Sequence, residues 1–107
     1  MKTEAPAFRL TEIAETDLAE IWSYLASEAS EAVATRFLSS ITARFDDVLL
    51  FPMSGAPRPQ LGPGLRAIFK HNYAIYYVPR DGEVVIVRVL HGSRDVDAIA
   101  DQGGFLP

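Results

Sequence analysis

The spacing of apolar residues changes across residues 52–64, and this change constrains the fold more than any other feature of the sequence. The segment reads PMSGAPRPQLGPG and holds four prolines and three glycines, so neither a helix nor a central strand is expected within it. Before it, apolar residues recur with the period of a helix, and after it they alternate as in a strand. The sequence therefore predicts a helical part, a loop and then a sheet.

Two helices are expected before the loop. The first has Thr16 as its predicted N-cap and Asp17 in its first turn, with its apolar residues on one face and Asp17 and Glu20 elsewhere. The second is expected to begin after Ser30 and to end at Pro52. The apolar face of the first helix consists of Leu18, Ile21, Trp22 and Leu25, and that of the second of Val33, Phe37, Leu38, Ile41, Phe45, Val48 and Leu49. Because the break between the helices is short, they should pack as an antiparallel hairpin.

The strand signals predict an antiparallel meander after the loop. Residues 65–70, 73–78 and 83–91 are rich in Ile, Val and Tyr and are separated by short turn signals. A short first strand is expected within residues 7–13. A short final helix is expected after Ser93 as its N-cap, with Gly103 and Gly104 as its stop.

The resulting order, β-αα-βββ, is an α+β fold in a single domain of residues 1–107, with the helical hairpin packed on a small antiparallel sheet. Two helices cover only one face of such a sheet. The other face is therefore expected to be open, either as a polar surface or as a binding site.

The last strand, residues 83–91, is apolar on both faces, so it is predicted to be central. Strict alternation puts Val85, Val87, Val89 and His91 on one face and Val84, Ile86, Arg88 and Leu90 on the other. Arg88 interrupts an apolar face, and such a charge needs a partner. We expect a structural ion pair between Arg88 and an Asp or Glu of the helices.

Composition excludes several kinds of site. The chain has no cysteine, which removes disulfides, thiolate catalysis and cysteine-ligated zinc. Its two histidines lie on separate turns or strand ends, and the sequence holds no P-loop, GxGxxG, GxSxG or HExxH motif. We therefore expect no metal, no cofactor and no generic catalytic residues. The apolar runs are too short to span a membrane and no signal peptide is seen, which fits a cytoplasmic protein.

The charges are distributed unevenly along an acidic chain of net charge −4. Residues 1–51 hold four Lys/Arg and nine Asp/Glu, whereas residues 52–94 hold six Lys/Arg and two Asp/Glu. The carboxyl half could thus present a basic face to an anion or an acidic partner. The alternative is that these charges form an ordinary solvated surface.

The stretch HGSRD, residues 91–95, ends the last strand and has two interpretations. In the first it is only a turn from a strand to a helix, with Gly92 at the exit and Ser93 as a cap. In the second, His91, Ser93 and Arg94 form a polar site beside the start of a helix, able to hold an anion or a carboxylate.

Several segments together resemble the ParE branch of the ParE/RelE superfamily of toxins from bacterial type II toxin-antitoxin modules. They are DLAEIWSYLA in the first helix, FPMSGAPRP and GLRAI around the loop, YAIYYV in the middle strand and VVIVRVLHGSRD at the end. These segments span most of the chain in the order of the family. The resemblance implies the RelE/ParE-like fold and a toxin that a cognate antitoxin keeps inactive.

The resemblance leaves three functions open. ParE-like members poison DNA gyrase by protein contact without a catalytic site, and this is the leading interpretation. The alternative, a RelE-like ribosome-dependent mRNA endoribonuclease, is expected to be strongly basic, because it grips the phosphates of RNA. This chain instead has a pI near 5.0. The endoribonuclease function stays open through His91 and Arg94, and a third alternative is a non-toxic member that only binds an antitoxin. No sequence-specific binding of nucleic acid is expected.

The resemblance also implies partners and contact residues. A cognate ParD-like antitoxin would fold on the toxin and cover its apolar surface. The residues predicted to contact the antitoxin are Trp22, Phe45 and Tyr76, although core positions are an alternative for each. The residues predicted to contact the target are Arg58, Arg66, His91, Ser93 and Arg94.

Overall fold

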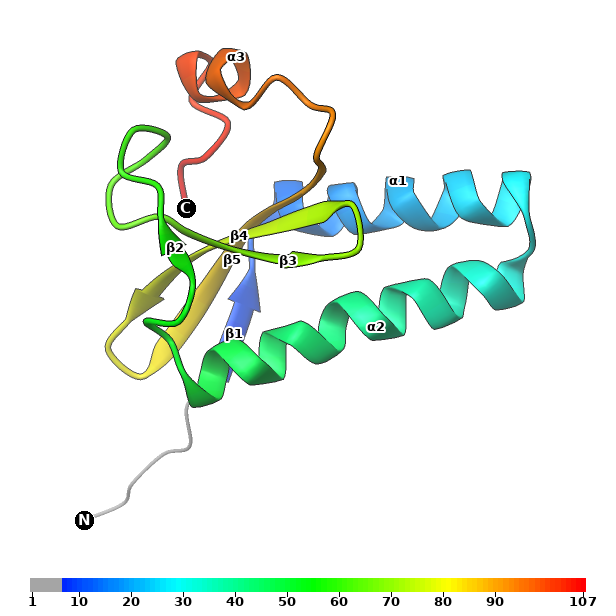
Figure 1. Ribbon diagram of the computed structural model, residues 1–107, viewed down its shortest axis with the longest axis horizontal. Coiled ribbons are helices and arrows are strands. Elements are labelled where there is room, and N and C mark those ends of the chain that lie inside the picture. The colour runs from blue at the N-terminus through cyan, green and yellow to red at the C-terminus, as the bar shows by residue number, and fades with distance from the viewer. Residues whose placement is uncertain (1–6) are drawn as a thin grey trace.

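The computed structural model describes residues 7–107 and shows a helical hairpin packed on one face of a five-stranded sheet (Figure 1). The strands lie in the order β1-β5-β4-β3-β2. This architecture confirms the predicted α+β class and the β-αα-βββ order. The elements are β1 (Ala7–Leu10), α1 (Glu12–Glu28), α2 (Glu31–Leu50), β2 (Ala56–Pro57), β3 (Arg66–Lys70), β4 (Tyr73–Arg80), β5 (Glu83–His91) and α3 (Val96–Asp101).

Helix α1 begins earlier than the sequence predicted. Its N-cap is Thr11, whose hydroxyl accepts a hydrogen bond from the Ala14 N–H at 3.0 Å and donates one to the Val87 carbonyl at 2.9 Å. Thr16, the predicted cap, lies inside the helix, where its hydroxyl donates to the Glu12 carbonyl. The prediction was wrong because β1 ends at Leu10 and the contact of Thr11 with β5 starts the helix directly after it.

Helix α2 has the predicted bounds. Ser30 caps it by accepting a hydrogen bond from the Val33 N–H at 3.1 Å, and the helix ends at Leu50, two residues before Pro52. Ile41, Phe45 and Val48 are completely buried between this helix and the sheet. None of the helices between residues 7 and 107 combines the length and apolarity needed to cross a bilayer.

The predicted antiparallel meander is confirmed as β3, β4 and β5, and β1 joins it in parallel beside β5. Strand β5 is therefore central, as expected. The loop contains one two-residue strand, β2, which pairs with β3 at the edge of the sheet. A central strand was excluded there because of the prolines, and an edge position is the one that proline tolerates.

A β-bulge changes the faces of β5. Tyr76 pairs with Arg88 whereas its neighbour Tyr77 pairs with Ile86, so Val87 is the extra residue on β5. Beyond the bulge the alternation is reversed. Val89 packs with Val84 and Ile86 on the helix side, and the predicted grouping of Val89 with Val85 and Val87 was wrong.

The second face of the sheet is not open, contrary to the prediction. Leu61 and Leu65 from the loop and Phe105 from the C-terminal segment cover it, and Phe105 is only 2% exposed. After α3 the C-terminal segment runs back toward the sheet (Figure 1), and its Phe105 packs on the second face. Helix α3 is capped by Asp95, which accepts from the Ala98 N–H, and not by Ser93 as predicted. It stops at Gly103, which has a positive φ of 74°.

Candidate functional site

The HGSRD turn joins β5 to α3 and is held together by its own hydrogen bonds. Nδ1 of His91 accepts the Ser93 N–H at 3.0 Å and lies 2.8 Å from the Ser93 hydroxyl oxygen. The Arg94 N–H donates to the His91 carbonyl at 3.1 Å. Because Nδ1 acts as an acceptor for the backbone, a neutral His91 ring carries its proton on Nε2.

Aromatic side chains fix the position of both histidines. The Tyr73 ring meets the His91 ring edge-on with centroids 5.2 Å apart, and Phe37 of α2 packs against Tyr73 and stacks on His71 at 5.4 Å. Burial raises the pKa of the Tyr73 hydroxyl above its ordinary value of 10.0, and the nearby Tyr24 adds to this. Tyr73 therefore stays neutral and packed at neutral pH.

A hollow of about 470 Å³ lies beside this turn on the second face of the sheet. The buried Ala74 and Tyr76 form its apolar floor, and the exposed Phe69 also lines it. Burial raises the pKa of Tyr76 although Arg58 opposes the shift. Among the residues that the structure describes, the lining contains no Asp or Glu. Its polar groups include Arg58, His71, His91 and Arg94. We call it the basic hollow, and its charge suits a carboxylate or another anion.

A smaller hollow of about 160 Å³ lies on the other side of the same turn. Asp17, Glu20 and Tyr24 of α1 line it, and it shares His91 and Arg94 with the basic hollow. His91 and Arg94 thus separate an acidic surface from a basic one. Within residues 7–107, no three His, Cys, Asp or Glu side chains are arranged to hold a metal ion.

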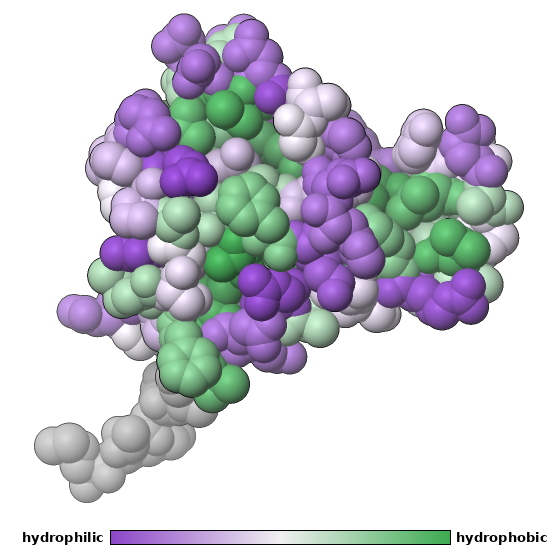
Figure 2. All heavy atoms as spheres, viewed as in Figure 1, coloured by the Kyte–Doolittle hydropathy of each residue, from purple (hydrophilic) through white to green (hydrophobic). Residues whose placement is uncertain are grey.

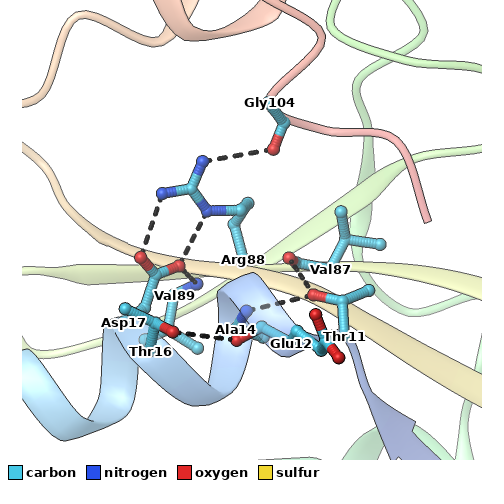
Figure 3. Close-up of polar contacts among 9 residues, drawn as sticks. All are labelled: Thr11, Glu12, Ala14, Thr16, Asp17, Val87, Arg88, Val89 and Gly104. Atoms are coloured by element: carbon cyan, nitrogen blue, oxygen red, sulfur yellow. Dashed lines mark hydrogen bonds and ion pairs between the residues drawn. The ribbon is translucent and has the colours of Figure 1, made fainter.

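A buried ion pair supports the strand that carries this turn (Figure 3). Arg88 donates from Nε and Nη2 to the Asp17 carboxylate at 2.8 and 2.9 Å, which confirms the predicted pair with a helix. Asp17 itself is only 7% exposed, so its predicted position off the buried face was wrong. The sequence did contain a sign of this burial: Asp17 lies one helical turn before the buried Ile21, so both residues lie on the same face of the helix.

The residues predicted to contact the target fall into two groups. Arg58, His91 and Arg94 line the basic hollow, and Ser93 is hydrogen-bonded to His91 beside it. Arg66 lies elsewhere, because its side chain turns to the loop after α2 and donates to the Met53 and Gly55 carbonyls at 3.0 and 2.7 Å. It lines a separate hollow of about 420 Å³ together with Arg80.

The residues predicted to contact the antitoxin are largely internal. Phe45 is completely buried, and Tyr76 is 6% exposed and meets the solvent only in the basic hollow, so both side chains lie mainly in the core. Trp22 is half-buried and donates from Nε1 to the Thr35 hydroxyl at 3.2 Å, which joins α1 to α2. His71 and Tyr73 were not predicted as site residues, since only the folded sheet brings the β3–β4 turn beside the end of β5.

Comparison with known proteins gives a consistent match. A family model described as the ParE toxin of the type II toxin-antitoxin system, parDE, matches residues 8–96. Toxin ParE1 from two Mycobacterium tuberculosis strains, CDC 1551 / Oshkosh and ATCC 25618 / H37Rv, is 28% identical over 91 residues, covering 84% of this chain and 93% of the relative. A solved structure titled as the chromosomal ParDE TA system from P. aeruginosa superposes with a TM-score of 0.71 at 19% identity. It covers 81% of this chain and 96% of the matched chain, and it shows the same fold.

Proposed function

The chain belongs to the family of ParE toxins of type II toxin-antitoxin systems, and from this premise we propose that it inhibits DNA gyrase by protein contact. A cognate ParD-like antitoxin would neutralise it in a hetero-oligomer, and both would act in the bacterial cytoplasm. In this proposal the toxin has no catalytic site of its own, and the family resemblance supplies the identity of the target.

The observation that carries the proposal is the basic hollow. It gathers Arg58, Arg94 and two histidines around an apolar floor on a chain that is acidic overall. An acidic, partly apolar protein surface fits such a hollow, because cations at the rim steer the partner and the floor buries apolar area. A long RNA backbone would instead meet the net negative charge of the rest of the chain.

One observation favours the enzymatic alternative, a ribosome-dependent mRNA endoribonuclease. His91 and Arg94 both line the basic hollow, and the Tyr73 ring packs edge-on against His91. A histidine could act as a general acid or base and an arginine could stabilise charge on a phosphate. A non-toxic member that only binds its antitoxin is the third alternative.

Induction of the chain alone in a bacterial host tests the proposal. Incorporation of labelled thymidine, uridine and methionine is followed over the first minutes. An early loss of thymidine incorporation with DNA-damage signalling, followed by inhibition of supercoiling by purified gyrase, is the expected result. An immediate loss of methionine incorporation with continuing DNA synthesis would favour mRNA cleavage, and unimpaired growth would favour the non-toxic alternative.

A further inference from the structure

The turn between β3 and β4 has an unusual backbone conformation. Only His71 and Asn72 join the two strands, since Lys70 pairs with Tyr73. His71 has a positive φ of 54°, and within residues 7–107 it is the one residue other than glycine with such a value. Glycine takes a positive φ without steric cost and commonly occupies the first central position of a two-residue turn. The backbone of this turn therefore favours glycine over histidine at position 71.

The side chain of His71 contributes little to the core. It is exposed, and its ring stacks on Phe37 of α2 with the centroids 5.4 Å apart and the ring planes at 27°. This contact orients the imidazole at the surface. The fold thus accepts a conformational cost at a residue whose side chain it does not bury. A strained residue in an exposed position is typical of a functional site.

The strained turn is attached to the HGSRD turn. The Gly92 N–H donates to the Asn72 carbonyl at 2.7 Å, and a Cβ added at Gly92 would lie only 3.3 Å from that oxygen. Glycine at position 92 therefore permits the two turns to lie in close contact. As a result, His71 and His91 line the same basic hollow from different turns. Figure 2 shows hydrophilic atoms over the β3–β4 turn of Figure 1 and apolar atoms on the sheet beside it.

The groups that line the basic hollow suit a carboxylate. Arg58 and Arg94 contribute guanidinium groups, His71 and His91 contribute imidazoles, and the described part of the lining holds no acidic side chain. An imidazole N–H can donate to a carboxylate oxygen, and a guanidinium can bind a carboxylate through two N–H groups. A single carboxylate meets these donors without bringing a long row of negative charges toward a chain of net charge −4.

We propose that His71 is a specificity-determining residue of the basic hollow, where its imidazole contacts a carboxylate side chain of the target protein. This inference rests on the proposed function and adds the β3–β4 turn to the target surface. The target contact explains why histidine occupies a position whose backbone favours glycine, because glycine would satisfy the turn but would bring no hydrogen-bond donor to the hollow.

The test compares His71→Gly and His71→Asn with the wild-type chain, all full-length. Glycine and asparagine both tolerate a positive φ, so each variant keeps the turn and removes the imidazole. The concentration that half-inhibits supercoiling by purified gyrase should rise about 10-fold in both, as expected for the loss of one hydrogen bond to a charged group. The thermal midpoint of His71→Gly should equal or exceed that of wild type, since the backbone strain is relieved.

Lys70→Gln is the matched control. Lys70 is the charged neighbour of His71 in sequence, but it is not among the residues that line the basic hollow. This variant should inhibit gyrase within about twofold of wild type. A second measurement, binding of the wild-type chain to immobilised gyrase without DNA, should show a complex that both His71 variants weaken.

The results separate this inference from the proposed function. Inhibition by both folded His71 variants within about threefold of wild type overturns the role of His71 and leaves the proposed function intact. A thermal midpoint that falls by more than about 5 °C in both variants assigns His71 to the stability of the turn and also overturns it. Binding that requires DNA would place a phosphate in the hollow and overturn the carboxylate. A wild-type chain that leaves gyrase active overturns both proposals.

Discussion

The carboxylate of Asp17 binds Arg88 through both of its oxygens, and one of these oxygens also accepts the Val89 N–H at 3.0 Å. Val89 follows the bulge in β5, where the regular pairing with β4 is interrupted. Arg88 in turn donates from Nη1 to the Gly104 carbonyl at 3.2 Å. One carboxylate thereby joins α1, the irregular point of β5 and the C-terminal segment that covers the second face (Figure 3).

Replacing Asp17 by Ala should lower the free energy of unfolding by about 3 to 5 kcal/mol, because Arg88 would keep its burial and lose its partner. Urea denaturation followed by circular dichroism measures this. Asp47→Ala is the control, since Asp47 pairs with Arg44 at an exposed position and should cost at most about 1 kcal/mol. A loss below about 1 kcal/mol for Asp17→Ala would show that the ion pair does not hold these elements together.

Replacing Gly55 by Ala should also destabilise the fold. An added Cβ would lie 2.5 Å from the Tyr77 hydroxyl oxygen, inside the hydrogen-bonded contact that fixes the loop after α2. The expected cost is about 1 to 3 kcal/mol in the same denaturation experiment. Gly62→Ala is the matched control, because its added Cβ meets nothing closer than 3.5 Å. Equal stability of the two variants would contradict the tight contact.

Phe105→Ala should uncover part of the second face. Phe105 packs edge-on against Tyr76 with centroids 4.8 Å apart, and its removal leaves a cavity over the apolar sheet. We expect a loss of about 3 to 5 kcal/mol of stability. The neighbouring Leu106→Ala, at a 69% exposed position, should change stability by less than about 0.5 kcal/mol. If both variants behave alike, the C-terminal segment does not protect this face.

Stability should fall as the pH rises above 10. Burial raises the pKa of Tyr73 and Tyr76 in the folded chain above the ordinary 10.0, so the unfolded chain loses these protons first. The neutral tyrosines therefore stabilise the folded chain fully below pH 10. This stabilisation is lost as the pH rises through the pKa values that Tyr73 and Tyr76 have in the folded chain. Thermal denaturation between pH 8 and 12 should therefore show a flatter decline for Tyr73→Phe than for wild type. An unchanged slope would contradict the raised pKa.

Arg94→Ala should reduce toxicity without loss of folding. Arg94 is exposed and lines the basic hollow, so the variant removes charge from the proposed target contact but no core packing. Growth after induction and inhibition of gyrase supercoiling measure the effect, with Arg36→Ala on the exposed side of α2 as the control. Unchanged toxicity in a folded Arg94→Ala variant would remove this residue from the target surface.

Part of the candidate site could be predicted locally. HGSRD is one continuous stretch, so His91, Ser93 and Arg94 were certain to lie close together. Arg58 joins them and Arg66 does not, although both were predicted from the same basic segment. Their separation depends on the path of the loop over the sheet, because Arg66 turns toward the carbonyls after α2 whereas Arg58 lines the hollow.

The sequence by itself determined the main helices and strands and their order, although not the short β2, since the helical period, the proline-rich loop and the alternating strands are local properties of the chain. Only the tertiary structure decided which side chain meets which. Strict alternation could not reveal the bulge at Val87, because a bulge depends on pairing with a neighbouring strand. Likewise, the burial of Asp17 and the cover that Phe105 provides arise from contacts between segments more than 25 residues apart in sequence.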